Sequence, residues 1–472
     1  MPRTSYERLS SDAAALIADE SSRRFGHLGT LLIFDAGPLA WSHGAVDFSA
    51  VRAAIDASLA GVPHYRRKLS WIPLERYPVW VDDDEFRLDY HVRHTSLPQP
   101  GSFQQLRKVA ARIQSQRLDR SRPLWEYWVV EGLEGDRFAI LTKTHLALIQ
   151  DAGTDALQAL LKPDPNAPVE DTPPHRPQPA PAAAELFYEE VVRKARLLRR
   201  TWGWMREAVA TDPWTRTLRG QLDRAAQLLG YTVAERHELP LRGPVGPHRA
   251  VDYLVLPLPV VEAVRGALGG TTLDVILATL AGAVGRYLAL HYVNPTTLDL
   301  RVSLPVALEA EGGGQSVGEW TFELPVWEAD PARCFARVKR ARLEAQSAQS
   351  ALRSADIGSV ETLPTSTLPA AAARVLGSPA ETTLRLATFP APRERLYMRG
   401  ARLAACFANL PLSGQAGMGV GVFSYDGALH WGINADYDRM PDLSRFTEAL
   451  RQSFRALERL ASERPLSLVR AS

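Results

Sequence analysis

The stretch from residue 162 to 184, KPDPNAPVEDTPPHRPQPAPAAA, is dense in proline and has no apolar repeat. Proline fixes φ near about −65° and lacks the backbone N–H, so it ends helices and is excluded from the middle of a sheet. A segment of this composition forms an extended, semi-rigid connector. The sequence therefore predicts two folded parts, one on each side of this segment.

The two parts are large enough to be separate domains. The chain has 472 residues, whereas a single hydrophobic core rarely serves more than about 250–300 residues. Strand-like and helix-like segments alternate in both parts, which indicates a mixed α/β fold. We predict the following division: a first domain over 1–162, the proline-rich linker over 163–184, connecting helices over 185–240 and a second domain over 241–472.

The composition is that of a folded globular protein. Apolar residues make up 46% of the chain and the net charge is only +2, which gives no basis for a nucleic-acid partner. Cys334 and Cys406 are too few for a disulfide framework and favour a reducing compartment. We find no signal peptide at the start and no run of the roughly 20 apolar residues that a membrane span needs. We expect a cytoplasmic protein that meets lipid, if at all, from the side.

Three elements are recognisable in the first part. Residues 27–37 are rich in aliphatic and β-branched residues and predict a strand, and 102–118 has apolar residues at helical spacing. Residues 124–145 read as two strands joined by the acidic glycine turn at 134–136. This hairpin places His145 at a strand end, where loops often carry function.

Several kinds of chemistry lack their motifs in this sequence. There is no Gly-x-Ser-x-Gly nucleophile elbow, no phosphate-binding glycine loop and no cluster of His, Cys and carboxylates with metal-ligand spacing. We therefore expect neither a metal nor a cofactor. Histidine remains as a candidate general base, since its unperturbed pKa of about 6.5 suits proton transfer near neutral pH.

Motifs along nearly the whole chain resemble those of the bacterial wax ester synthase/diacylglycerol acyltransferase family. This family is similar in fold to chloramphenicol acetyltransferase and uses coenzyme A thioesters. The matching segments are RLSSDAAALIADE (8–20), SRPLWEYWVVEGLEGDRFAILTKTH (121–145), LRGPVGPHRAVDYLVLPL (241–258), GTTLDVILATLAGAVGRYL (270–288), TFPAPRERLYMRGARL (388–403) and INADYDRMPDLSRF (433–446). The resemblance implies two chloramphenicol-acetyltransferase-like domains that meet at a tunnel, which acyl-CoA and a lipid alcohol enter as substrates.

The family's signature is His-His-x-x-x-Asp-Gly, whose second histidine takes the proton of the acceptor hydroxyl. Aligned without a gap, His145 takes the first histidine position and Leu146 the second, while Gln150 falls at the aspartate and Asp151 at the glycine. Leucine cannot accept a proton, so the family's base is absent from its position. Only a shifted alignment lets His145 act as the base, with Asp151 as structural support.

The resemblance also assigns residues to the tunnel. Besides Leu146, two of them depart from the family, because Leu273 and Thr388 stand where it has asparagines. Asp274 could also serve to cap a helix start. Packing is a sufficient role for Trp125, which we expect to be a large buried anchor. The predicted tunnel residues are Pro123, Leu124, Trp125, Leu146, Leu273, Asp274 and Thr388.

The sequence leaves more than one function open. The first is an O-acyltransferase that moves a long-chain acyl group from acyl-CoA to a fatty alcohol or diacylglycerol, with His145 as base. The second is a homologue that has lost its base and binds lipid, acyl-CoA or a partner protein, with His145 hydrogen-bonded for structure. A third is acyl transfer to a different acceptor. The oligomeric state is not indicated.

Residues 191–206, VVRKARLLRRTWGWMR, combine basic residues with tryptophans. A helix of this composition can lie in a membrane interface and attract anionic lipid, although a core-facing aliphatic stripe with a solvated charged face is an alternative. We expect contact with a membrane or lipid-droplet surface. The residues assigned to it are Arg196, Arg199, Arg200, Trp202 and Trp204.

Overall fold

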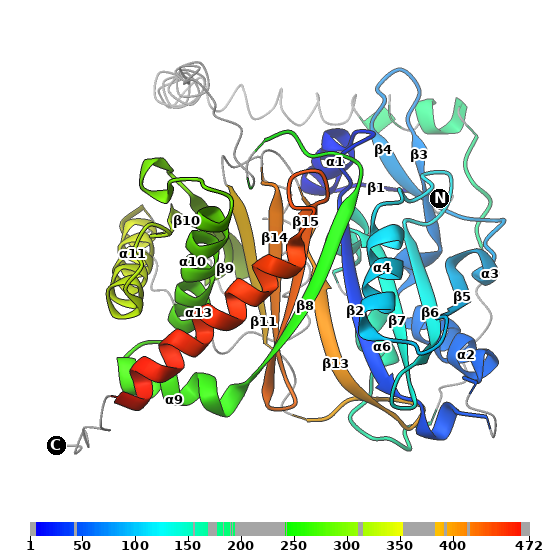
Figure 1. Ribbon diagram of the computed structural model, residues 1–472. Coiled ribbons are helices and arrows are strands. Elements are labelled where there is room, and N and C mark those ends of the chain that lie inside the picture. The colour runs from blue at the N-terminus through cyan, green and yellow to red at the C-terminus, as the bar shows by residue number, and fades with distance from the viewer. Residues whose placement is uncertain are drawn as a thin grey trace, which may run out of the picture.

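The structure is a computed structural model that places two six-stranded mixed sheets side by side, each in its own domain (Figure 1). The mixed α/β class and the two-domain organisation are confirmed. The structure describes residues 6–41, 45–153, 156–168, 177–182, 184–188, 190, 192–193, 241, 243–309, 315–352, 383–390, 394–412 and 416–463.

The first sheet has the strand order β12-β13-β2-β7-β6-β5, and only the β6–β5 pair is parallel. The predicted strand at 27–37 and the predicted hairpin at 124–145 are both present in it, as β2 and as β6–β7. Its strands are β2 (His27–Asp35), β5 (Val92–Ser96), β6 (Trp125–Leu133), β7 (Arg137–His145), β12 (Tyr397–Met398) and β13 (Ala401–Asn409).

Helices of the first domain pack on this sheet, and a small antiparallel sheet of order β1-β4-β3 lies beside it. The helix predicted at 102–118 is α4, which begins at a capping box made by Ser102 and Gln105. These elements are α1 (Ser11–Asp19), α2 (Phe48–Ser58), α3 (Leu88–His91), α4 (Phe103–Gln114), α5 (Leu146–Ala152), α6 (Ala156–Leu160), β1 (Tyr6–Arg8), β3 (Arg67–Trp71) and β4 (Pro78–Asp82).

The second sheet has the order β10-β9-β11-β14-β15-β8, with parallel pairing of β11 to both β9 and β14. In the described part of the chain, helices α9, α10, α11 and α13 cover one of its faces and form a separate hydrophobic core with it (Figure 1). The elements are β8 (Arg249–Pro257), α9 (Leu258–Leu268), α10 (Thr272–Leu290), β9 (Arg301–Glu309), β10 (Gln315–Glu323), α11 (Pro331–Leu352), β11 (Leu384–Pro390), β14 (Met418–Tyr425), β15 (Ala428–Asp436) and α13 (Leu443–Glu463).

Strands β12 and β13 belong to the first sheet, although the predicted second domain included all of residues 241–472. These strands follow β11 in the sequence, but β13 pairs with β2, from Leu403 opposite Phe34 to Asn409 opposite Gly29 (Figure 1). The second half of the chain therefore completes the first sheet. The physical reason is that β2 would be an edge strand without β13, and its unpaired N–H and C=O groups are satisfied by this segment of the second half.

Glycines let β13 cross close to the second sheet. A Cβ added to Gly432 would lie 2.2 Å from the carbonyl oxygen of Ala408, and one added to Gly421 would lie 2.8 Å from the same atom. Both distances are shorter than van der Waals contact, and the obstructing atom is backbone. The two strands β14 and β15 can therefore accept the crossing strand only without side chains at these positions.

The longest apolar helix is part of the core. By length and composition α10 could cross a membrane, contrary to the expectation that no run would qualify, but 67% of its apolar window is buried inside the protein. Its neighbours α11 and α13 pack against it. The run belongs to the interior of the second domain.

The segment after the first domain stays close to that domain where the structure describes it. Lys162 forms a backbone bridge with Tyr397, and Gln178 donates its N–H to Asp82 at 3.0 Å. Residues 184–188 are helical, and Leu186 is buried in a small cluster with Ile72 and with Val79 and Val81 of β4. Most of the predicted connecting helices, and the middle of the proline-rich linker, lie outside the described residues.

Candidate functional site

His145 ends β7 and forms the N-cap of α5. Its Nδ1 accepts a hydrogen bond from the backbone N–H of Ala147 at 3.0 Å, so this nitrogen satisfies a donor that the first turn of a helix leaves free. The side chain is 1% exposed. Because Nδ1 is an acceptor, the ring proton of the neutral histidine is on Nε2.

The Nε2 atom of His145 faces a buried carboxylate. It lies 3.0 Å from Oε1 of Glu20, although the N–H direction is outside the range of a good hydrogen bond. Gly26 lies against both groups. Its backbone N–H donates to Oε1 of Glu20 at 2.8 Å, and a Cβ added to it would lie 3.0 Å from Nε2 of His145. The ring is therefore enclosed on this side by carboxylate and backbone.

Three further contacts hold Glu20 in place. Arg120 donates two hydrogen bonds to Oε2 of Glu20, from Nη2 at 2.6 Å and from Nε at 3.2 Å. The same Nη2 donates to the carbonyl of Ile17 at 2.9 Å, which holds the guanidinium in place. His27, which is paired with His145 across β2 and β7, has its Nε2 at 3.5 Å from Oε1. We call Glu20, His27, Arg120 and His145 the Glu20 cluster.

The pKa values of Glu20 and His27 both lie below their usual ranges, and these shifts determine which of the two is charged. Burial raises the pKa of Glu20, but His145, His27 and Arg120 outweigh it, and the pKa falls well below the usual 4.5. Burial also holds the pKa of His27 well below 6.5, against the attraction of Glu20. The cluster therefore contains an ionised carboxylate paired with an arginine, beside a neutral His27.

This arrangement limits what His145 can do as a base. A general base needs a nitrogen lone pair within reach of the substrate hydroxyl. The lone pair of Nδ1 already accepts the N–H of Ala147, and Nε2 carries the proton beside Glu20. In this geometry neither nitrogen is free to take a proton from an alcohol.

The two residues that follow in the signature have structural contacts. Leu146 is 1% exposed and lies in the core of the first domain. Asp151 accepts the indole N–H of Trp80 at 2.7 Å and lies 3.3 Å from the backbone nitrogen of Ser10. Its partners are an indole and a backbone amide, which fits the structural role predicted for it.

The tunnel residues predicted in the first domain lie in its core. Pro123 and Leu124 are buried, and Trp125 is fully buried with its indole N–H donated to the carbonyl of Tyr65 at 2.7 Å. The Trp125 ring also stacks on His91, with centroids 4.6 Å apart. These contacts give Trp125 the anchoring role that its size suggested.

The tunnel residues predicted in the second domain are not part of the Glu20 cluster. Asp274 closes the capping box at the start of α10 with Thr271, and its carboxylate pairs with the buried Arg342 at 2.6 Å. Leu273 packs against the helix-covered core. Thr388 is half-buried on β11, on the same face as Leu386. The prediction that Asp274 serves a helix start is confirmed.

Two cavities lined by described residues lie in the second domain. One of about 400 Å³ is between β10 and α11, and one of about 250 Å³ is between α10, α13 and the segment at 326–331. Neither is lined by the Glu20 cluster. The predicted membrane-contact residues Arg196, Arg199, Arg200, Trp202 and Trp204 lie outside the described residues.

Glu20, His27 and Arg120 were not predicted from the sequence as members of a site. Glu20 ends a segment that carried the family resemblance, and His27 begins a predicted strand, but neither position signals a contact with residue 145. The contact depends on the register of β2 with β7, which places His27 opposite His145. The adjacent glycine at position 26 is a local signal of close approach, but it does not identify the partner.

Comparisons with known proteins match this chain over most of its length. Residues 9–276 match the wax ester synthase/diacylglycerol acyltransferase catalytic domain, and residues 314–458 match the C-terminal domain of the same family. A protein of Mycobacterium tuberculosis named as a diacylglycerol O-acyltransferase is 30% identical over 449 residues, which cover 89% of this chain and 85% of that protein. A similarly named protein of Mycobacterium bovis is 26% identical and covers 97% and 96%.

Solved structures show the same fold at low sequence identity. The wax ester synthase/diacylglycerol acyltransferase from Marinobacter aquaeolei VT8 has a TM-score of 0.66 at 21% identity, over 96% of this chain and 100% of that one. The first condensation domain of the CDA synthetase has a TM-score of 0.52 at 15% identity, over 99% of each chain. The fold is thus that of the two-domain acyltransferases and condensation domains. The chain belongs to the wax ester synthase/diacylglycerol acyltransferase family, as its motifs predicted.

Proposed function

We propose that this protein binds acyl-CoA and a lipid alcohol, the substrates of its family, and has lost most or all of the acyl transfer that a histidine base would support. The observation that carries the proposal is that Nδ1 of His145 accepts the N–H of Ala147, while Nε2 is buried 3.0 Å from the carboxylate of Glu20. The position at which the resemblance expects the proton acceptor is the buried Leu146. The two-domain fold remains available for binding.

The second candidate is the long-chain O-acyltransferase with His145 as base. It is favoured by the carboxylate of Glu20 at 3.0 Å from the ring, because a carboxylate beside an imidazole orients it and stabilises its protonated form. This candidate requires Nδ1 to leave the N–H of Ala147 and to become accessible to the acceptor alcohol. Transfer to a different acceptor would require the same change.

The experiment measures binding and turnover on the same preparation. Palmitoyl-CoA binding is followed by calorimetry, and free thiol release is followed with hexadecanol or dipalmitoylglycerol as acceptor. We expect saturable binding with thiol release at the level of the protein-free control. Failure to bind palmitoyl-CoA would overturn the proposal.

Variants at His145 separate the two candidates. His145→Asn keeps a side-chain oxygen that can cap α5 but cannot act as a base, and the exposed His291→Ala is the matched control. Thiol release by the unmodified protein that falls about 100- to 10,000-fold in His145→Asn alone would establish the second candidate. Release that is equal in all three proteins would exclude His145 as its source.

We also propose that the protein is cytoplasmic and touches an anionic lipid surface through residues 196–204. Phe187 and Tyr188, shortly before this segment, are 41% and 69% exposed, so apolar surface already faces outward there. We expect cosedimentation with anionic vesicles that is lost as salt rises, because salt screens the attraction of basic residues. Equal binding to neutral vesicles would contradict the electrostatic part of this proposal.

A further inference from the structure

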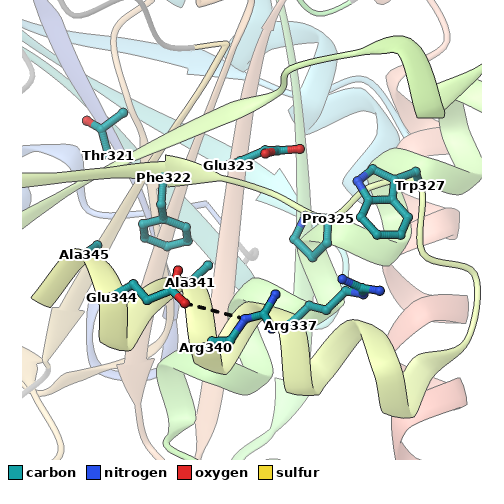
Figure 2. A pocket seen from close by; sticks show the side chains of 10 residues that line it. All are labelled: Thr321, Phe322, Glu323, Pro325, Trp327, Arg337, Arg340, Ala341, Glu344 and Ala345. Carbon is teal, nitrogen blue, oxygen red and sulfur yellow. Dashed lines mark ion pairs between the residues drawn. The ribbon is translucent and has the colours of Figure 1, made fainter. Parts of the chain in front are cut away.

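Strand β10 is at the edge of the second sheet, as the described residues form it. Among the described residues it pairs only with β9, and the cavity of about 400 Å³ lies along it beside α11. Figure 2 shows Phe322 pointing from the strand towards α11, while Thr321 and Glu323 point to the other side. Residues that face opposite sides of one strand line the same cavity, so the cavity follows the edge of the strand.

The hydrogen-bond register shows which backbone groups face this edge. The N–H of Leu324 donates to the carbonyl of Leu300 at 2.8 Å, which makes even-numbered residues of β10 the ones that bond to β9. Pro305, which has no N–H, lies opposite Glu319 and fits this alternation. The N–H and C=O groups of Thr321 and Glu323 are therefore directed outward, two residues apart, as an added strand requires.

The side of α11 that faces the edge provides a floor for side chains. Ala341 and Ala345 are one helical turn apart and leave space opposite Phe322 and Pro325 (Figure 2). Arg340 and Glu344 border this floor and pair with each other at 3.6 Å. An extended segment lying along β10 would turn every second side chain towards this apolar floor.

The charge at the edge indicates the chemistry of the opposite side chains. Glu323 is exposed, and its cross-strand neighbour on β9 is Arg301, which pairs with Asp299 at 3.1 Å. The carboxylate of Glu323 has no ion pair with a described residue, so a basic residue placed opposite it on an added strand would be favoured. Two β10 edges paired antiparallel around Thr321 would instead oppose Glu319 and Glu323, which disfavours a second copy of this chain.

We propose that the edge of β10 and the facing side of α11 form a docking site for an extended segment of another protein. The segment alternates apolar residues, which contact the floor at Ala341 and Ala345, with polar residues that include a base opposite Glu323. It adds a seventh strand to the sheet through the backbone of Thr321 and Glu323. This is the strand-addition mode of peptide recognition, in which the groove beside a helix selects alternate side chains.

The test uses defined peptides and amide hydrogen exchange on the full-length protein. The probes are acetylated hexapeptides of alternating lysine and valine, of alternating glutamate and valine, and a lysine–valine peptide interrupted by proline. With the lysine–valine peptide at ten times its dissociation constant, exchange at the amides of Thr321 and Glu323 slows by about tenfold. The glutamate–valine peptide binds more weakly, and the proline-interrupted peptide leaves exchange unchanged.

Two variants with matched controls complete the test. Thr321→Pro removes an outward N–H at a position that does not bond to β9, and it abolishes peptide binding, whereas Thr321→Val keeps the N–H and retains binding. Glu323→Gln reduces the preference for the lysine–valine peptide. The proposal is overturned if no peptide slows exchange, or if Thr321→Pro binds as well as Thr321→Val. It is also overturned if the amides of Thr321 and Glu323 are protected from exchange in the absence of peptide at every protein concentration. Protection that increases with protein concentration would overturn it as well, because a second copy of the chain would then cover the edge.

Discussion

The carboxylate of Glu20 and the imidazole of His145 lie 3.0 Å apart, with both side chains buried, although the two residues are 125 positions apart in the sequence. Glu20 also receives Arg120, and His145 also caps α5. The pair thus joins the end of α1 to the end of the central hairpin of the first sheet. These contacts mean that His145 mainly fixes the positions of α1, β7 and α5 relative to one another.

Removing the carboxylate tests that structural role. In Glu20→Ala, Arg120 loses its ion pair and the N–H of Gly26 loses its acceptor, so we expect about 2–3 kcal/mol lower stability. The matched control is Asp19→Ala, whose carboxylate is 46% exposed and lies 3.4 Å from Arg24, and which should change stability by less than about 0.5 kcal/mol. Urea unfolding of both variants measures the difference, and equal effects would refute a special role for Glu20.

Acid should destabilise this protein from pH 7 downward. His27 has a folded pKa held well below 6.5 by burial, so the unfolded chain binds a proton below pH 6.5 that the folded chain does not. Glu20 acts in the same direction at lower pH, because its folded pKa is below 4.5 despite burial. Each such group lowers the free energy of unfolding by up to about 1.4 kcal/mol per pH unit inside its window.

The measurement is the urea midpoint at several pH values between 7.5 and 4.5. His27→Phe, which keeps a ring next to Phe25, should flatten the dependence between about pH 6.5 and 5. Substitution of the exposed His291 by Gln serves as the control and should leave the dependence unchanged. A stability that rises as pH falls in this range would contradict the assignment of a neutral, buried His27.

The sequence predicted elements better than it predicted contacts. The hairpin at 124–145 and the helix at 102–118 depend on local patterns of apolar residues, turns and caps, and both are present. The addition of β13 to β2 and the approach of Glu20 to His145 depend on partners more than 100 residues away. Those contacts are set by strand register and by packing between the two halves, which a single sequence does not display.

Because β13 crosses close to Gly432 on β15, we expect two glycine substitutions to differ strongly in their effect on stability. In Gly432→Ala the new methyl group would lie 2.2 Å from the carbonyl oxygen of Ala408, and backbone must move to accommodate it. We expect a loss of at least about 2 kcal/mol. Gly266, exposed inside helix α9 with no heavy atom near a new Cβ, is the control, and Gly266→Ala should stabilise by about 0.5–1 kcal/mol. Thermal unfolding checks both signs, and a tolerated Gly432→Ala would show that β13 does not cross here.

Asp151 accepts a hydrogen bond from the buried Trp80, so we expect the loss of stability on substitution to depend on whether the new side chain keeps an acceptor oxygen. Asp151→Ala leaves the indole N–H of the fully buried Trp80 without its partner at 2.7 Å and removes the contact with Ser10, which should cost about 1–3 kcal/mol. Asp151→Asn retains an oxygen that can accept the same N–H, so its loss should be less than half as large. Urea unfolding followed by circular dichroism measures both. Equal losses would mean that the negative charge of Asp151, rather than its hydrogen bond to Trp80, stabilises the start of α1 against α5.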